Sequence, residues 1–243
     1  MYKEVWKEYR KGFKFLIPFI LVLVLFESVT DNFSFSPINF FGGSFSAFKD
    51  AAVNNLGQVS IGLLLGSLFY PFLMVVMKVL VNEGKVNYRE SLKESTGLYL
   101  RYLALNIVTS AILIGIMLLG FLPIVMPLAL ILLTLVNALL IPCSAYLIYY
   151  HASIKEALKK GMLIGKKYFS EIFLLSISMI IIGTIILGIM SGIMSLANID
   201  IKTNPAGNVL INLINVIIMT YLYMYIVAIC KREEEIQGKI LSY

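Results

Sequence analysis

The sequence predicts an all-α polytopic membrane protein with about six transmembrane helices, and three observations lead to this. Of its 243 residues, 59% are hydrophobic and only 14% are charged, whereas soluble domains are about 45–50% apolar and about 25% charged. The apolar residues form six long runs, each near the roughly 20 residues that cross about 30 Å of hydrocarbon. Lysine and arginine collect in alternate connections between the runs. No long polar segment intervenes, so we expect a single membrane domain, 1–243.

The first run follows a basic segment, an arrangement that signal peptides share. Residues 27–31, Glu-Ser-Val-Thr-Asp, offer no small-residue cleavage site, so we favour a retained helix. The third and fourth runs are separated by a few residues around Pro123 and are expected to form a tight hairpin. The six spans are expected at 13–29, 59–81, 102–121, 126–150, 172–197 and 209–230.

The distribution of basic residues predicts the orientation of the chain. Eighteen of the 20 lysines and arginines lie before or just inside the first run, near the end of the second or between it and the third, between the fourth and fifth, or after the sixth. The opposite side holds only Lys49 and Lys202. Because cytoplasmic connections carry the excess of basic residues, we expect a cell-membrane protein with both termini in the cytoplasm. The net charge of +6 is explained in this way, and no nucleic-acid partner is expected.

The longest connection on the outer side, 30–58, is rich in phenylalanine. Aromatic side chains concentrate at the membrane–water boundary, so an aromatic belt is the favoured interpretation. A lid over an outward-facing cavity is the alternative. The residues concerned are Phe33, Phe35, Phe40, Phe41, Phe45 and Phe48.

A short motif recurs before three of the spans. Residues 3–8, 89–94 and 155–160 each read basic, Glu, any residue, apolar, Lys, charged. With apolar residues on one helical face, such segments are expected to be amphipathic helices on the inner leaflet. Three parallel repeats of interfacial helix plus hairpin would follow, although helix-forming residues before a span give the same pattern without repetition. The expected amphipathic segments are 3–12, 87–100 and 152–168.

The basic side chains of these segments are candidate contacts for anionic inner-leaflet lipid or for a protein partner. Each such charge near an anionic surface contributes about 1 kcal/mol of attraction. The candidates are Lys7, Arg10, Lys11, Lys93, Lys159, Lys160, Lys166 and Lys167.

The run Lys-Glu-Ala-Leu-Lys-Lys at 155–160, followed by Gly161, Lys166 and Lys167 before a long span, resembles poorly characterised prokaryotic six-helix integral membrane families. It is more distantly similar to the membrane domain fused to some glycerophosphodiester phosphodiesterases. The resemblance implies a membrane-embedded module. The catalytic barrel of those enzymes is not in these 243 residues, so the resemblance carries over no activity and no functional residue.

Ionisable residues inside the spans are scarce, and such residues usually mark function. Glu27, near the outer end of the first run, is the leading candidate, whereas Lys78 and His151 are expected to anchor at the interface. One histidine and two separated cysteines do not suggest a metal site. Cys143 and His151 are eight residues apart, about 12 Å along a helix, which is not a catalytic dyad. We therefore expect no catalytic residue, cofactor or metal.

Amide side chains within the spans either join helices or line a ligand site; the candidates are Asn106, Asn137, Asn212 and Asn215. The favoured function is a non-enzymatic permease-like protein or membrane partner subunit that handles a small or lipid-like molecule. The alternative is a scaffold that binds a cytoplasmic partner or anionic lipid through its basic amphipathic helices. An intramembrane enzyme is third.

Overall fold

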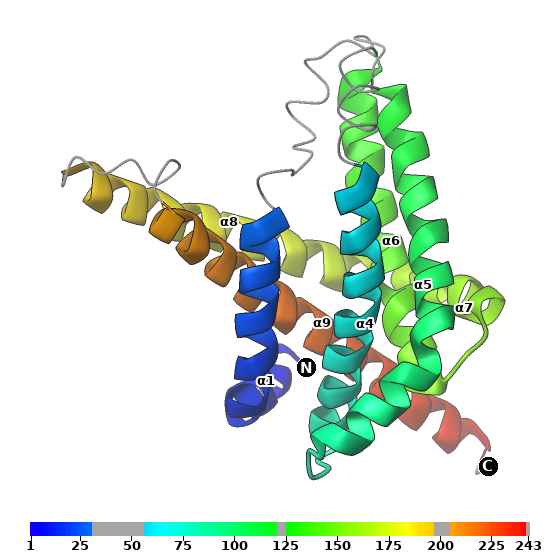
Figure 1. Cartoon of the computed structure of the whole chain (residues 1–243). Helices are drawn as coiled ribbons and strands as arrows, with labels where there is room; N and C mark the ends of the chain where they lie inside the picture. Colours follow the sequence, from blue (N-terminus) through cyan, green and yellow to red (C-terminus); the bar gives the residue numbers. More distant parts are fainter. Residues whose placement is uncertain (31–55, 121–124, 197–204, 242–243) are drawn as a thin grey trace.

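The fold is described from a computed structural model, for residues 1–30, 56–120, 125–196 and 205–241. Within these ranges every regular element is an α-helix (Figure 1). The phenylalanine-rich connection and the Pro123 hairpin turn fall in 31–55 and 121–124, outside the described residues. The helices are α1 (Tyr2–Thr30), α4 (Leu56–Val81), α5 (Tyr88–Leu119), α6 (Met126–Tyr150), α7 (Ile154–Lys167), α8 (Phe169–Leu196) and α9 (Pro205–Leu241).

Five helices of the described chain are long and apolar enough to cross a membrane. These segments are Ser60–Val81, Tyr88–Leu119, Met126–Tyr150, Phe169–Ile193 and Val209–Ile236. Each exceeds the length that about 30 Å of hydrocarbon requires. The chain is an all-α polytopic membrane protein, as the sequence predicts.

The sixth expected span, 13–29, lies within α1, which the structure places as one unbroken helix. It is not among the five, and the side chain of Glu27 near its end lies outside the described part of the chain. The crossing of the membrane by α1 therefore stays a prediction, as does the functional role of Glu27.

The three amphipathic segments join their spans in different ways. Residues 3–12 and 87–100 are the first turns of α1 and α5, continuous with the apolar part of each helix. Only the third segment is a separate helix, α7. Its N-cap is Ser153, whose side chain accepts a hydrogen bond from the backbone N–H of Glu156 and so satisfies one free donor of the first turn. The threefold repeat stays a prediction.

Helix α4 is shared by two packing clusters. Leu73 and Met77 pack into a core with α1 and α9, whereas Met74 and Val75 face a second core with α5, α6 and α7. All four side chains are fully buried. Helix α4 therefore packs against both the α1–α9 pair and the α5–α6–α7 group.

Helices α8 and α9 pack together and run at a wide angle to α4, α5 and α6 (Figure 1). The outer face of α8 is lined by exposed isoleucines, among them Ile181, Ile185 and Ile189. Such a surface would be costly in water, but hydrocarbon is its natural surrounding. This exposed apolar face agrees with a helix that lies against lipid.

Candidate functional site

Most of the described charged side chains gather at one end of the bundle, which we call the charged end. There the Lys231 ammonium of α9 donates to the carbonyl oxygen of Val81 at the end of α4, at 2.9 Å. The Tyr149 hydroxyl of α6 donates to the Glu234 carboxylate, at 2.7 Å. The ends of α4, α6 and α9 are thus joined directly.

A second group at the charged end joins α4, α5 and α6. One oxygen of Glu94 in α5 lies 2.9 Å from the Lys78 ammonium and 2.8 Å from His151 Nε2. His151 also follows the last turn of α6 in a left-handed conformation, with φ of 52°, and its carbonyl accepts from Arg101 at 3.0 Å. Because Lys78 Nζ is 3.2 Å from the same Nε2, the imidazole nitrogen donates to Glu94 when protonated and accepts from Lys78 when not.

A third group fixes the end of α7 to α9. One oxygen of Glu233 accepts from the Lys167 ammonium at 2.7 Å and from the Tyr168 hydroxyl at 2.5 Å. Glu233 and Tyr168 are buried. Burial, and after it the Glu233 carboxylate, raises the pKa of the Tyr168 hydroxyl to about 12. The chain leaves helical geometry at Tyr168, so this contact sits where α7 ends and α8 begins.

Helix α7 runs back along α6 at very short distance, and two glycines permit the approach. A Cβ at Gly161 would lie 2.5 Å from the Cα of Cys143, and one at Gly165 would lie 2.8 Å from the carbonyl oxygen of Leu139. Gly161 and Gly165 are one helical turn apart, so they form one face. Helix α7 therefore packs antiparallel to the last turns of α6, and its place on the inner leaflet stays a prediction.

A groove of about 710 Å³ lies along the flank of α7, between α6, α7 and the start of α8. Two lysines, Lys159 and Lys166, are seven residues apart and hence on the same side of the helix, about 10 Å apart along it. Neither forms an ion pair with any described residue. The floor is apolar, with Leu163 58% exposed. The groove is lined by Leu139, Lys159, Met162, Leu163, Lys166 and Phe169.

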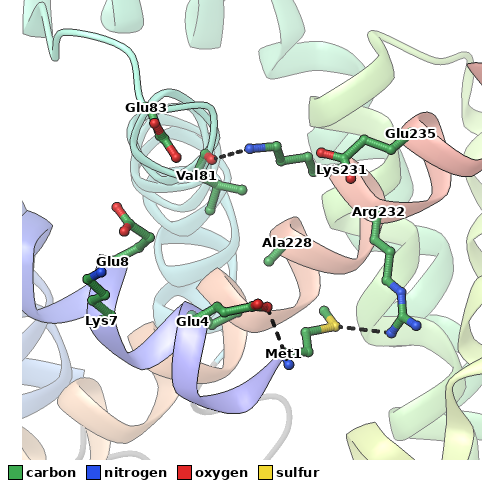
Figure 2. A pocket seen from close by; sticks show the side chains of 11 residues that line it. Met1, Glu4, Lys7, Glu8, Val81, Glu83, Ala228, Lys231, Arg232 and Glu235 are labelled. Atoms are coloured by element: carbon green, nitrogen blue, oxygen red, sulfur yellow. Dashed lines mark hydrogen bonds and ion pairs between the residues drawn. The ribbon is translucent and has the colours of Figure 1, made fainter.

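A second cavity, of about 620 Å³, lies at the charged end between α1, α4 and α9. Figure 2 shows Glu4 and Glu8 on one side of it and Lys231 and Arg232 on another. Charges of both signs line it, and Lys231 is held by the Val81 carbonyl. The cavity is therefore an open, mixed-charge depression. Its lining residues are Met1, Glu4, Val5, Lys7, Glu8, Val81, Glu83, Ala228, Lys231, Arg232 and Glu235.

The four amide candidates divide into two pairs. Asn106 donates to the Ser67 hydroxyl of α4 at 3.3 Å, and Asn212 donates to the Ser28 hydroxyl of α1 at 3.2 Å. Such bonds between helices support packing. Asn137 and Asn215, by contrast, are exposed. The structure does not gather the four amides into one site.

The candidate basic residues are exposed but differ in their contacts. Lys11 pairs with Glu8 at 3.0 Å, Lys160 lies 3.8 Å from Glu156, and Lys167 binds Glu233. The remainder make no ion pair with a described residue, and they are Lys7, Arg10, Lys93, Lys159 and Lys166.

Cys143 and His151 have different partners. The Cys143 thiol is buried and lies 3.8 Å from the carbonyl oxygen of Leu158, whereas His151 is at the charged end beside Glu94. The structure does not bring them together. Among the described residues, no group of three His, Cys, Asp or Glu side chains could hold a metal ion.

Several residues of the site were not anticipated from the sequence. Gly161 and Gly165 sit four apart, a spacing that signals close helix packing. Tyr168 ends the segment after two lysines, but nothing in the order of residues indicates that its partner is Glu233, 65 positions later. These are the residues that fix α7 in place.

The fold and the charged end define a polytopic α-helical membrane protein. No family model, no curated protein and no solved structure matches this chain. The resemblance carried by residues 155–160 therefore stays a prediction. Only the geometry of the site bears on the function.

Proposed function

We propose that this chain is a non-enzymatic multi-pass module of the cell membrane that binds anionic lipid at the cytoplasmic leaflet through α7. The carrying observation is the groove where Lys159 and Lys166 stand over apolar side chains of α6, α7 and α8. An exposed lysine at the end of a span lies near the headgroups and attracts a counter-charge there. Anionic headgroups supply it in the cytoplasmic leaflet.

The charged end faces the cytoplasm in this proposal, with both termini on that side. Support comes from the lysine and arginine distribution and from the contacts that join the basic segments at one end, such as Lys231 with Val81. The variant Lys155→Cys, which carries one exposed thiol on α7, tests this orientation. An impermeant maleimide should label this thiol in inverted membranes and not in intact cells, and labelling of intact cells would contradict the orientation. The two native thiols are buried and give little background.

The lipid-binding function is tested with the whole chain reconstituted in nanodiscs. A ligand that binds only the folded protein raises its stability by mass action. We expect the unfolding temperature to be several degrees higher with phosphatidylglycerol present than in pure phosphatidylcholine. High salt should reduce the difference, since charge attraction at a surface is screened. Equal unfolding temperatures in both lipids would refute the proposed function.

A second function, a permease-like protein or partner subunit that handles a small molecule, is favoured by Asn137 and Asn215. Both amides are exposed on spanning helices, where an unsatisfied polar group is costly. Native mass spectrometry of the protein from its own membranes tests this reading. A bound protein or small molecule that is lost in Asn137→Leu or Asn215→Leu would support it, and identical adducts in wild type and variants would oppose it.

A further inference from the structure

The groove between α6, α7 and α8 is lined by apolar side chains of three helices as well as by two lysines, which distinguishes it from a diffuse basic surface. Its lining comes from three helices: Leu139 from α6, Lys159 and Lys166 from α7, and Phe169 from α8. A diffuse surface would need only the lysines of α7. The spanning helices α6 and α8 thus contribute part of the apolar lining of the groove.

The position of the groove along α6 determines what can occupy it. Leu139 lies eleven residues before the end of α6, about 16 Å along the helix. Gly165 packs against its backbone, so Lys166 on the next position of α7 is held near the same level. The two ammonium groups thus stand beside apolar side chains of α6 and α8. A ligand that covers both the ammonium groups and these apolar side chains would be amphipathic.

The two lysines are also free to bind a ligand, unlike their neighbour. Lys167 is engaged by Glu233, which turns that side chain toward α9, and no described carboxylate pairs with Lys159 or Lys166. The spacing of about 10 Å along α7 allows both ammonium groups to reach one phosphate headgroup from opposite sides, because lysine side chains are long and flexible. Exposed Met162 and Leu163 lie between them.

We infer that this groove binds a single anionic phospholipid, with its phosphate between Lys159 and Lys166 and an acyl chain along Leu139, Leu163 and Phe169. The inference rests on the proposed function and deepens it by assigning a defined site and stoichiometry. The two proposals fail differently, because anionic lipid can bind the exposed lysines of α7 diffusely, without one phosphate fixed between Lys159 and Lys166.

The test is native mass spectrometry of the whole chain in detergent, titrated with phosphatidylglycerol or with phosphatidylcholine of the same chains. Wild type should retain one phosphatidylglycerol in preference to phosphatidylcholine. The double variant Lys159→Gln/Lys166→Gln should bind it at least tenfold more weakly, and Lys159→Arg/Lys166→Arg should retain it. Leu163→Gln should weaken retention several-fold, because this exposed position can change without disturbing the core.

The matched control is Lys155→Gln/Lys160→Gln, which removes two charges from the same helix outside the groove. It should bind within twofold of wild type. If both double variants lost phosphatidylglycerol binding equally while anionic lipid still raised the unfolding temperature, the single-lipid site would be overturned and the proposed function would remain. Equal retention of the two lipids by wild type, or full retention by the groove variant, would also overturn the inference.

Discussion

Gly161 of α7 lies directly against the backbone of Cys143 in α6, so close that a Cβ at position 161 would stand 2.5 Å from the Cα of Cys143. This contact determines which face of α7 points outward. Because the face of α7 that carries Gly161 and Gly165 packs on α6, Lys159 and Lys166 line the groove. The proposed lipid site therefore depends on a contact that contains no charged residue.

Gly161→Ala should destabilise the protein by about 1–3 kcal/mol, because inserting a methyl group into a close-packed contact forces the backbones apart. Thermal unfolding in detergent measures this. The control is Gly97→Ala on α5, where a Cβ meets nothing within 4 Å and where alanine, a better helix former, should be neutral or slightly stabilising. Equal unfolding temperatures for the two variants would show that α7 does not pack as described.

Glu233→Gln should also lower stability, by about 1–3 kcal/mol, because the buried hydroxyl and the ammonium that share this carboxylate lose their charged acceptor. Glu235→Gln is the matched control, since Glu235 is two residues away and exposed. The unfolding temperature of the control should stay at the wild-type value. If the two substitutions changed the unfolding temperature equally, the contact between α7 and α9 at Glu233 would not stabilise the protein.

Tyr168 predicts a dependence on alkaline pH. Its pKa is raised to about 12, above the ordinary value of about 10, so folding favours the neutral hydroxyl. The resulting stability is full below pH 10 and is lost as the pH rises to 12. Tyr168→Phe cannot titrate, so its stability deficit relative to wild type should shrink between pH 10 and pH 12. A deficit that stays constant across this range would contradict the assignment.

Asn212 and Asn215 form a test pair on α9. Asn212 is buried and bonded to Ser28, whereas Asn215 is exposed. Hydrogen bonds between membrane helices contribute about 0.6 kcal/mol on average and up to about 1.7 kcal/mol. Asn212→Leu should lower the unfolding temperature measurably, and Asn215→Leu should leave it unchanged. The reverse order would show that the α1–α9 contact is misplaced.

The helical fold could be predicted from the sequence because hydrocarbon allows few alternatives. A run of about 20 apolar residues must satisfy its backbone internally, and a helix does so. The expected span 126–150 coincides with α6 for this reason. The expected segment 87–100 does not end as a separate helix, because α5 continues through it without a break.

The site could be predicted only in part. The pattern of charges identified Lys159 and Lys166 as candidate lipid contacts, but it treated Lys167 in the same way, although Lys167 binds Glu233. Which lysine points toward the bundle depends on its partner Glu233 on α9. The distance between the two side chains cannot be read from the order of residues. The groove itself needs Phe169 of α8 beside Leu139 of α6, a proximity that only the packing of the helices creates.

The most direct test of lipid binding by α7 is photo-crosslinking of the wild-type chain with a phosphatidylglycerol that carries a diazirine near its headgroup, followed by peptide mapping. The account predicts labels concentrated in residues 159–169, and their loss when unmodified phosphatidylglycerol competes. Labels spread over every exposed surface, including Ile181 and Ile185 of α8, with no effect of the competitor, would contradict it.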